Sequence, residues 1–403
     1  MGQVIEVSST PIGSVLLVDT DRSLTGQDGV SFDHSPDDTP DPPSVLATRL
    51  FDAIEGVESI HVLSNTLSVR RTAAWEPDQI ATAEDIVSSL FVFYTPESEE
   101  DQYEQLRDQY YNATLTDIRA HNDELWIIKV KPDEPPQPFD AGQYTSLALG
   151  FWEPRADAVM DDLKEGQGKK LARRSYSVSS SIVDGDDNLV EAHPDEVEFY
   201  IVKVQPDEEE IPALTPRLFL KEVGDRIFVG RKYTGQYTLD GVKPTDNVVF
   251  LGTGTGEAPH NAMTAELLRR GHQGKILSVV TVRYRNDLGY LREHEVVQSK
   301  WPNYKYVILT TREPENEGNK VYIQDLVASG GVEEELGALL DPKNTHVFLC
   351  GNPAMIGLPR WNDEVPEFPE TLGVCQMLHQ FGFTIDHRAE HGNVHYEVYW
   401  KVE

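Results

Sequence analysis

The chain has 403 residues and a formal net charge of −33, from 68 Asp and Glu against 35 Lys and Arg. This charge excludes nucleic acid and anionic membranes as expected partners, because neutralising phosphate groups requires Lys and Arg. The length predicts two or three domains. An apolar run of about 20 residues and a basic-then-apolar start are both absent from the sequence, which predicts a cytoplasmic protein.

About half of the excess negative charge lies in the first 110 residues, which hold 21 Asp and Glu, 5 Arg and no Lys. Two interpretations stay open. The charge either maintains solubility, for example in a salty cell, or forms an acidic docking surface that attracts basic partners.

Residues 1–105 predict a small α+β domain. The predicted elements are a strand at 14–18, a helix at 44–54, a hairpin of 60–63 and 67–71, and a helix at 77–91. Their hydrophobic spacing, with Leu46, Leu50 and Ile54 on one helix face and Trp75 after the strands, resembles the amino-terminal domain of NifU/Nfu iron–sulfur scaffold proteins. The Cys-x-x-Cys module of that family is absent. The resemblance therefore implies docking to an iron–sulfur protein or self-association.

A charged stretch at 95–108 is predicted to be a linker, and residues 110–242 are predicted to form an antiparallel β-barrel. Short runs rich in Val, Ile, Tyr and Thr, bounded by Pro, Gly and Asp, supply the strands. The predicted strands are 125–131, 143–149, 175–179, 197–204 and 226–230.

Within the predicted barrel, the motif Arg174-Ser175-Tyr176-Ser177 has the chemistry to hold a flat heterocycle linked to a diphosphate. The guanidinium can fork onto the diphosphate, the phenol ring can cover the heterocycle, and the Ser177 hydroxyl can bond a ring nitrogen. An Arg–Tyr pair is also common decoration of a strand surface, so the motif alone leaves both readings open.

Residues 243–403 alternate apolar strands with helices, the pattern of a doubly wound α/β domain with a parallel sheet. The predicted elements are a strand at 248–251, a helix at 259–270, and strands at 276–282, 306–310 and 346–350. The loop Gly252-Thr253-Gly254-Thr255-Gly256 joins the first strand to the helix, where backbone N–H groups can face a diphosphate.

Cations, rather than an acidic residue, follow the next strands of this domain. Arg283, Arg285 and Arg312 lie at or just past strand ends, whereas an acidic residue that would bind a ribose 2′-hydroxyl is absent there. Cations suit a 2′-phosphate, so the pattern favours NADP over NAD.

Two further motifs, Cys350-Gly351-Asn352-Pro353 and Glu397-Val398-Tyr399-Trp400, complete an order in which residues 110–400 resemble the bacterial ferredoxin (flavodoxin)–NADP reductase family. Lesser signatures are Ala141-Gly142-Gln143-Tyr144, Glu198-Phe199-Tyr200, Leu214-Thr215-Pro216-Arg217 and Leu288-Gly289-Tyr290-Leu291. The resemblance implies an FAD-binding barrel at 110–242 and an NADP-binding α/β domain at 243–403. It also implies an enzyme that exchanges electrons between NADPH and ferredoxin or flavodoxin through FAD.

The resemblance also implies the residues of the site. The implied FAD-binding residues are Arg174, Ser175, Tyr176, Ser177, Tyr200, Ile201, Val202, Lys203, Ala213, Leu214, Thr215, Thr255, Tyr399 and Trp400. The implied NADP-binding residues are Gly254, Thr255, Gly256, Arg283, Tyr290, Thr311, Arg312, Lys320, Gly351 and Met355. The implied catalytic residues are Tyr176, Ser177, Cys350, Glu397 and Tyr399.

The resemblance places the Tyr176 ring against the isoalloxazine, Ser177 near its N5 atom, and Thr255 between the flavin and the arriving nicotinamide. Tyr399 would shield the flavin face and Trp400 would stack on the FAD adenine, although Lys401-Val402-Glu403 follow them here.

Three of these roles have a plainer alternative. Tyr290 either stacks on the NADP adenine or is an ordinary loop tyrosine, and Glu397 either relays protons or is a solvated strand carboxylate. Cys350 either abuts the nicotinamide or only packs in the core.

A basic cluster of Lys169, Lys170, Arg173 and Arg174 precedes and overlaps the flavin motif. We expect Lys169 and Lys170 to steer an acidic carrier protein, because charge complementarity raises association rates.

A different class of function is an iron–sulfur assembly or interaction protein in which the reductase body serves as a docking or vestigial module. Cys350 and Cys375 are the two cysteines and are expected to be reduced thiols. Two isolated cysteines exclude a fused ferredoxin module and a cysteine-ligated cluster.

His387, His391 and His395 recur at four-residue spacing, which would form a metal-binding face on a helix. Gly392 and the strand-like residues 394–400 argue against a continuous helix, so no metal site is predicted.

Overall fold

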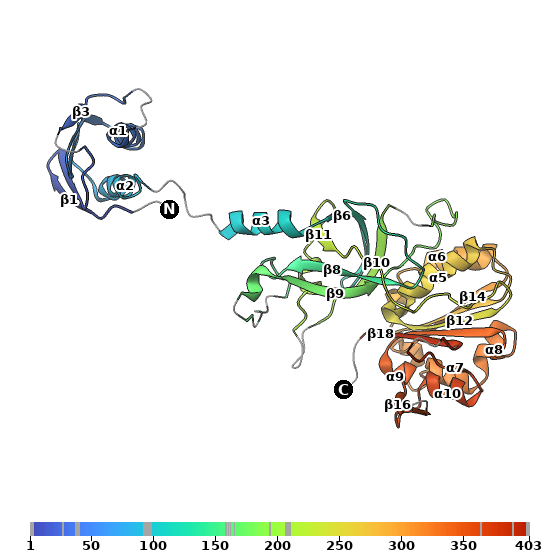
Figure 1. The fold of residues 1–403 in the computed structure, drawn as a ribbon. Helices are drawn as coiled ribbons and strands as arrows, with labels where there is room; N and C mark the ends of the chain where they lie inside the picture. Colours follow the sequence, from blue (N-terminus) through green and yellow to red (C-terminus); the bar gives the residue numbers. More distant parts are fainter. Residues whose placement is uncertain are drawn as a thin grey trace. The chain divides into compact units, whose positions relative to one another are not determined.

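The computed structural model describes residues 4–25, 28–36, 41–91, 99–157, 159, 161, 163–164, 166–192, 195–205, 211–362, 365–388 and 391–399. The chain divides into two compact units, Met1–Gln102 and Tyr103–Glu403 (Figure 1). No helix in these described ranges has the length and apolarity that a membrane span requires.

The first unit is a five-stranded antiparallel sheet with two helices, in the strand order β1-β2-β5-β4-β3. Its elements are β1 (Val7–Ile12), β2 (Val15–Thr20), β3 (Val30–Phe32), α1 (Pro42–Ala53), β4 (Val57–Leu63), β5 (Thr66–Arg71) and α2 (Pro77–Ser88). Alternate residues of β2 and β5 are buried and pack with α1 residues such as Leu46 and Leu50. The sequence pattern missed β1 and β3, because these strands bury few apolar side chains.

The stretch predicted to be a linker is helical from Glu99, so that prediction is wrong there: α3 spans Glu99–Tyr110. Glu, Gln, Leu and Arg are good helix formers, and the polarity of the stretch concealed this propensity. Near the end of α3, the Arg107 guanidinium bonds the buried Glu153 carboxylate at 2.9 Å, and Tyr110 and Tyr111 pack around the Trp152 ring. The end of α3 is therefore anchored to the second unit.

The second unit begins with a six-stranded antiparallel sheet in the order β10-β7-β6-β11-β8-β9. Its elements are β6 (Ala113–Asn122), β7 (Leu125–Pro132), β8 (Tyr144–Gly150), β9 (Leu171–Ser177), β10 (Val197–Val202), α4 (Thr215–Leu218) and β11 (Arg226–Val229). The predicted barrel is not closed. The ladder stops because the chain leaves β9 into irregular turns, and in the described ranges the backbone of this segment pairs with β10 only at an isolated bridge between Ser179 and Glu198.

A parallel five-stranded sheet follows in the order β14-β13-β12-β15-β18, which confirms the predicted α/β domain. Its strands are β12 (Asn247–Thr253), β13 (Ile276–Val282), β14 (Tyr304–Thr310), β15 (Thr345–Gly351) and β18 (Val394–Val398). Its helices are α5 (Glu257–Arg269), α6 (Leu291–Lys300), α7 (Ile323–Ala328), α8 (Gly331–Leu336), α9 (Pro353–Ile356) and α10 (Val374–Gln380), and a small hairpin joins β16 (Arg360–Asn362) to β17 (Val365–Glu367).

The parallel sheet is covered on both faces, with α5 and α6 on one side and α7, α8, α9 and α10 on the other (Figure 1). Successive residues of β12 point alternately into the hydrophobic cores on the two faces of the sheet. Val248 and Phe250 pack with α5, whereas Val249 and Leu251 pack with α7 and α10. This double burial explains why the strands read as unbroken apolar runs in the sequence.

Candidate active site

The carboxyl ends of β12, β15 and β18 lie side by side in the parallel sheet. Gly252 pairs with Cys350, and Cys350 pairs with Glu397, so three of the predicted motifs meet at one edge. In an open α/β sheet, ligands bind outside the carboxyl ends of the strands, where neighbouring connections leave in opposite directions. The β12 connection runs to α5 on one face and the β15 connection runs to α9 on the other, so this edge is the candidate site.

Two glycines allow the loops after β12 and β15 to touch. A Cβ atom on Gly256 would lie 2.4 Å from the Cys350 carbonyl oxygen, and one on Gly351 would lie 2.3 Å from Thr253 Oγ1. The Asn352 N–H donates to the same Thr253 Oγ1 at 2.7 Å. A side chain at either glycine would therefore force the two loops apart.

Ser177, Cys350 and Glu397 converge at this edge although they come from two different sheets. Ser177 Oγ, from β9, donates to Glu397 Oε2 at 2.6 Å. The Cys350 thiol donates to the same oxygen at 3.9 Å. Ser177 and Cys350 are buried, so this contact joins the antiparallel sheet to the parallel one in the interior of the second unit.

Burial raises the pKa of the Glu397 carboxyl to about 7, and the hydrogen bonds from Ser177 and Cys350 oppose this rise only in part. The pKa of the Cys350 thiol is raised well above its usual value, first by burial and then by the nearby Glu397 carboxylate. The thiol therefore stays neutral near pH 7, whereas the carboxyl is close to half-protonated. A carboxyl in this state can both give and take a proton, unlike an ordinary solvated carboxylate.

Tyr399 lies over the loop after β12. Its hydroxyl donates to the Thr255 carbonyl oxygen at 3.0 Å, while 38% of the residue remains exposed. Trp400 and residues 401–403 lie outside the described residues.

Apart from Thr255 and Tyr399 in the parallel sheet's loops, the described residues predicted to bind FAD lie on or next to the two edge strands of the six-stranded sheet and on a nearby turn. On β9, Arg174 and Ser175 are exposed and Tyr176 is half-buried. On β10, the Tyr200 hydroxyl donates to the Asp287 carbonyl oxygen at 3.1 Å and accepts from the Gly289 N–H at 2.9 Å. Of the remaining predicted residues, Ile201, Ala213, Leu214 and Thr215 are buried, Lys203 is half-buried and Val202 is exposed.

The predicted NADP cations differ in how they are paired. Arg283 is bonded to Glu124 and Asp287, each at 3.0 Å. Arg312 and Lys320 are exposed, and the Arg312 N–H donates to the Arg283 carbonyl oxygen at 2.8 Å, which joins the ends of β13 and β14. Thr311 also bonds β13 through its hydroxyl, which donates to the Val282 carbonyl oxygen at 3.2 Å.

Tyr290 does not offer its ring to a nucleotide, which corrects the prediction that it stacks on adenine. The residue is fully buried, and its hydroxyl donates to Glu198 Oε1 and lies 2.8 Å from Ser179 Oγ. The Tyr200 ring packs edge-on against it. Met355, another predicted NADP contact, is also buried, in the core between the parallel sheet and α9.

An aromatic residue that the sequence reasoning overlooked is better placed for adenine. Tyr322 is 46% exposed and directly precedes α7, two residues after Lys320. The Gln324 side chain donates to the Ala354 carbonyl oxygen at 3.4 Å, which holds this segment beside α9 and the Cys350 loop. The sequence did offer a signal for Tyr322, because this aromatic residue lies between the cation Lys320 and the start of α7.

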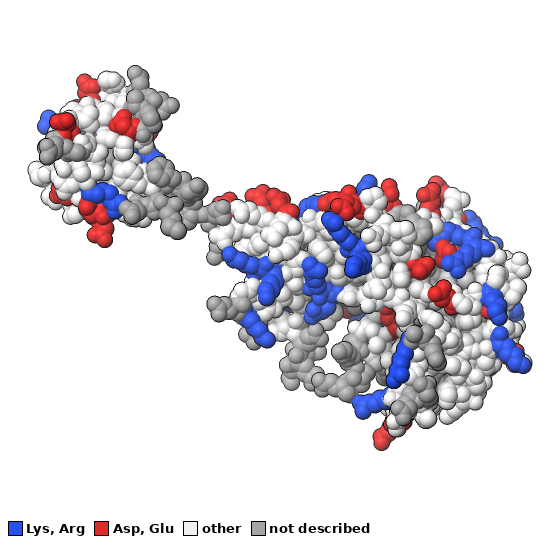
Figure 2. All heavy atoms as spheres, viewed as in Figure 1, with Lys and Arg blue, Asp and Glu red and all other residues white. Residues whose placement is uncertain are grey.

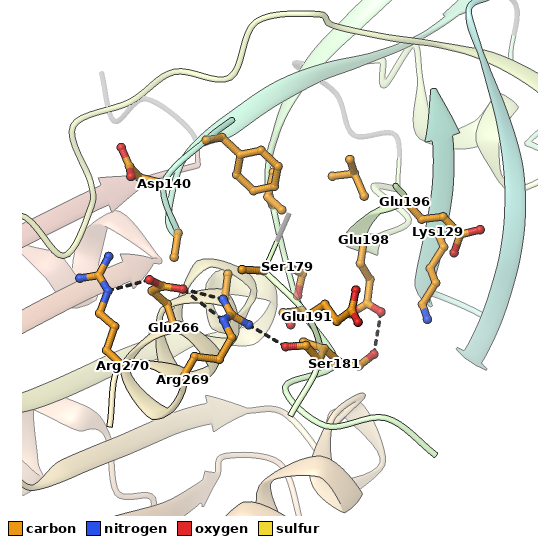
Figure 3. A pocket seen from close by; sticks show the side chains of 18 residues that line it. Lys129, Asp140, Ser179, Ser181, Glu191, Glu196, Glu198, Glu266, Arg269 and Arg270 are labelled. Atoms are coloured by element: carbon orange, nitrogen blue, oxygen red, sulfur yellow. Dashed lines mark hydrogen bonds and ion pairs between the residues drawn. The ribbon is translucent and has the colours of Figure 1, made fainter. Parts of the chain in front are cut away.

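A separate hollow lies between the six-stranded sheet and α5 (Figure 3). There Ser181 Oγ donates to Glu198 Oε2 at 2.6 Å, and Arg269 and Arg270 both bond Glu266. None of the predicted site residues lines this hollow, so it is distinct from the candidate site.

Comparisons with known proteins match the part of the chain that forms this site. The family model described as oxidoreductase NAD-binding domain matches residues 250–360. A flavodoxin/ferredoxin–NADP reductase of Buchnera aphidicola subsp. Schizaphis graminum is 29% identical over 249 residues, which cover 61% of this chain and 87% of the relative. The Escherichia coli protein of the same name is 28% identical over 248 residues, with the same two coverages. These similarities support the resemblance to the ferredoxin–NADP reductase family that the sequence motifs indicate.

The fold agrees with that family. A ferredoxin NADP+ reductase from Neisseria gonorrhoeae, solved with bound FAD and NADP, matches with a TM-score of 0.54 and 20% identity over 72% of this chain and 98% of that one. The Plasmodium falciparum ferredoxin-NADP+ reductase with 2'P-AMP matches with a TM-score of 0.50 and 15% identity over 73% and 97%. The second unit of this protein thus has the reductase fold.

Proposed function

We propose that this protein is a ferredoxin (flavodoxin)–NADP+ reductase, a flavoprotein that exchanges electrons between NADPH and a one-electron carrier through FAD. The observation that carries this proposal is the contact of Ser177 from the antiparallel sheet with Glu397 and Cys350 from the parallel sheet. It lies at the end of β12, in a chain whose reductase relatives match over most of their length.

The residues present fit both cofactors. Gly254 has a positive φ of 53°, and a Cβ atom there would meet nothing within 4 Å, so its backbone is open to a ligand. The half-buried Tyr176 ring and the exposed Arg174 supply a flat cover and a diphosphate partner on the same strand. Bound FAD would supply the chemistry that accepts two electrons as a hydride and passes them on one at a time.

Glu397 holds or releases a proton, Ser177 orients the carboxyl by donating to Oε2, and the buried Cys350 thiol stays neutral beside it. Tyr399 covers the site. Its hydroxyl bonds the Thr255 carbonyl oxygen and its ring is partly exposed, so the ring can swing aside for the nicotinamide.

Arg312 and Lys320 bind the NADP 2′-phosphate in this proposal, and the exposed Tyr322 ring stacks on the adenine. Arg283 contributes less, because Glu124 and Asp287 already neutralise it.

Lys169 and Lys170 steer the acidic carrier, from a basic cluster at and just before β9 that also contains Arg173 and Arg174. Figure 2 shows Lys and Arg side chains over the part of the molecule that contains the six-stranded sheet. Changing Lys169 and Lys170 to Glu should lower the carrier reduction rate and weaken its salt dependence. An unchanged rate and salt dependence would exclude the two lysines as steering residues.

Residues 1–105, 110–242 and 243–403 act as three domains in this proposal, the first of them a NifU/Nfu-like module that binds an iron–sulfur protein or a second copy. The alternative of an iron–sulfur assembly protein with a vestigial reductase body is not favoured, because the reductase relatives match the body itself.

A visible spectrum of the purified protein, followed by anaerobic addition of NADPH or NADH, tests the proposed function. We expect a flavin spectrum that NADPH bleaches faster than NADH. A colourless protein that also fails to bind added FAD would contradict the proposal.

A further inference from the structure

A second group of polar side chains lies at the amino ends of β15 and β18, at the opposite end of these strands from the candidate active site. His346 is the second residue of β15 and His395 is the second residue of β18. Asp386 and His391 come from the segment that precedes β18. Ligand atoms of Asp386, His391 and His395 all lie within 4.8 Å of one another.

We propose that Asp386, His391 and His395 bind a divalent transition-metal ion of the Zn²⁺ class. Two imidazoles and a carboxylate form a ligand set that suits Zn²⁺, with water as the fourth ligand. Because hard cations such as Mg²⁺ prefer oxygen ligands, the two imidazoles select against them.

The backbone holds the ligands together because the segment before β18 runs parallel to the start of that strand. Ile385 pairs with Val394 in a parallel bridge, and the Asp386 N–H donates to the Val394 carbonyl oxygen at 2.9 Å. Gly392 packs so tightly on the Thr384 backbone that a Cβ atom there would lie 2.1 Å from the Thr384 carbonyl oxygen. The parallel pairing therefore places Asp386 beside His395.

The carboxylate already faces the imidazole that would share the ion. Asp386 Oδ1 accepts a hydrogen bond from the Gly392 N–H at 2.7 Å, and Asp386 Oδ2 lies 2.8 Å from His395 Nδ1. His395 is buried, whereas His391 is exposed and closes the group from the solvent side. A metal ion can thus reach the buried ligand atoms from water.

Two further groups orient His395 from behind. His395 Nε2 lies 3.1 Å from His346 Nδ1, and His346 Nε2 lies 3.5 Å from Asp246 Oδ2. A metal-bound histidine normally donates its other ring N–H to an acceptor, which fixes the ring and its tautomer. With a metal ion on Nδ1, His395 donates from Nε2 to His346, and His346 donates toward Asp246. His346 and Asp246 thus supply one acceptor each for these two donated hydrogen bonds.

The site is separate from the proposed reductase chemistry but lies on the same strand. His395 stands two residues before Glu397, and its ring stacks on Phe348 at a centroid distance of 4.4 Å. A bound ion would tie Asp386 and His391 to the strand that leads to Glu397 and Tyr399.

The neighbouring His387 provides a matched control. It directly follows Asp386, but its ring stacks on Trp361 at a centroid distance of 4.0 Å, and it is not part of the ligand group. The helical spacing considered from the sequence is therefore replaced by a loop-and-strand arrangement in which only His391 and His395 of the three histidines take part.

The test is Zn²⁺ titration calorimetry on the untagged, FAD-loaded full chain, with metal content measured after dialysis. We expect one Zn²⁺ per chain for the wild type and for His387→Ala, and loss of this binding in His391→Ala. His346→Ala should bind about 10- to 100-fold more weakly, as expected for a residue that orients a ligand. Mg²⁺ in excess should not displace Zn²⁺.

FAD content and circular dichroism establish that each variant is folded. Because His391 is exposed, we expect His391→Ala to fold like the wild type. Zn²⁺ should also raise the thermal midpoint of the wild type and not that of His391→Ala, because binding to the native state alone stabilises it. Absence of Zn²⁺ binding in the wild type would overturn the proposal. Equal loss of binding in His387→Ala and His391→Ala would do the same.

Discussion

Two carboxyl groups, of the buried Glu198 and the half-buried Glu397, lie where the antiparallel and parallel sheets meet, and they are satisfied to different degrees. Both oxygens of Glu198 accept a hydrogen bond from a hydroxyl group, one from Tyr290 and one from Ser181. Glu397 has a single hydroxyl donor, Ser177, and a distant thiol, with no ion pair to Glu397 among the described residues. Burial raises the pKa of both carboxyls, but only Glu397 lies at the ends of the strands where ligands bind.

This difference separates a group that fixes the structure from one that is available for chemistry. A fully bonded polar network makes a contact rigid and unique, whereas an incompletely satisfied carboxyl retains the capacity to exchange a proton. The same contrast holds between the paired Arg283 and the exposed Arg312 and Lys320. Matched substitutions of the bonded and the available groups test whether this difference holds.

The largest effect is expected at the exposed cations. Changing both Arg312 and Lys320 to Ala should lower the preference for NADPH over NADH by at least about 100-fold, since each charged hydrogen bond to a phosphate contributes about 1.5–3 kcal/mol. Arg283→Ala should cost markedly less, because its charge is already neutralised. Steady-state kcat/KM for both nucleotides measures this, and an equal loss in Arg283→Ala would remove the contrast.

A smaller effect is expected at the two tyrosines, and of a different kind at each. Tyr322→Ala should raise KM for NADPH about 10-fold at constant kcat, because a stacking face contributes about 1 kcal/mol or slightly more. Tyr290→Phe should leave KM unchanged and destabilise the fold by about 1–3 kcal/mol, since Glu198 loses a buried donor. Urea unfolding with nucleotide kinetics separates the two, and a raised KM in Tyr290→Phe would restore the adenine role to that residue.

The smallest effect concerns stability and pH. The folded-state pKa of Glu397 is about 7, above its usual value of 4.5, so the native state keeps a proton that the unfolded chain has released. Stability should therefore fall as the pH rises from about 4.5 to 7, by at most about 3 kcal/mol. Glu397→Gln should remove this slope. Thermal midpoints from pH 5 to pH 8 measure it, and parallel curves for wild type and variant would contradict the raised pKa.

Regular elements with strong hydrophobic patterns were predictable from the sequence. The predicted strand at 276–282 matches β13 at both ends, because its apolar run is buried on both faces. β6 was missed, since Ala113 and Leu115 are its only fully buried residues and its remaining alternation is weak. The closed barrel was also mispredicted, because strand propensity does not determine whether the edge strands pair.

The candidate site was predictable mainly through family resemblance. Ser177 and Glu397 are 220 residues apart, and nothing in local sequence requires that they touch. The burial of Tyr290 depends on a partner, Glu198, 92 residues away, so the sequence could not distinguish an adenine platform from a core tyrosine. Long-range contacts of this kind become visible only once the two sheets are in place.

The most direct test of the account is the pH dependence of flavin reduction by NADPH, measured by anaerobic stopped flow in the wild type and in Glu397→Gln, with Glu198→Gln as the control. We predict a wild-type rate that titrates near pH 7 and a Glu397→Gln rate that is about 100-fold lower and independent of pH in this range. Glu198→Gln should keep the wild-type profile. A Glu397→Gln variant with the wild-type rate and profile would contradict the claim that this carboxyl is the functional group at the junction of the two sheets.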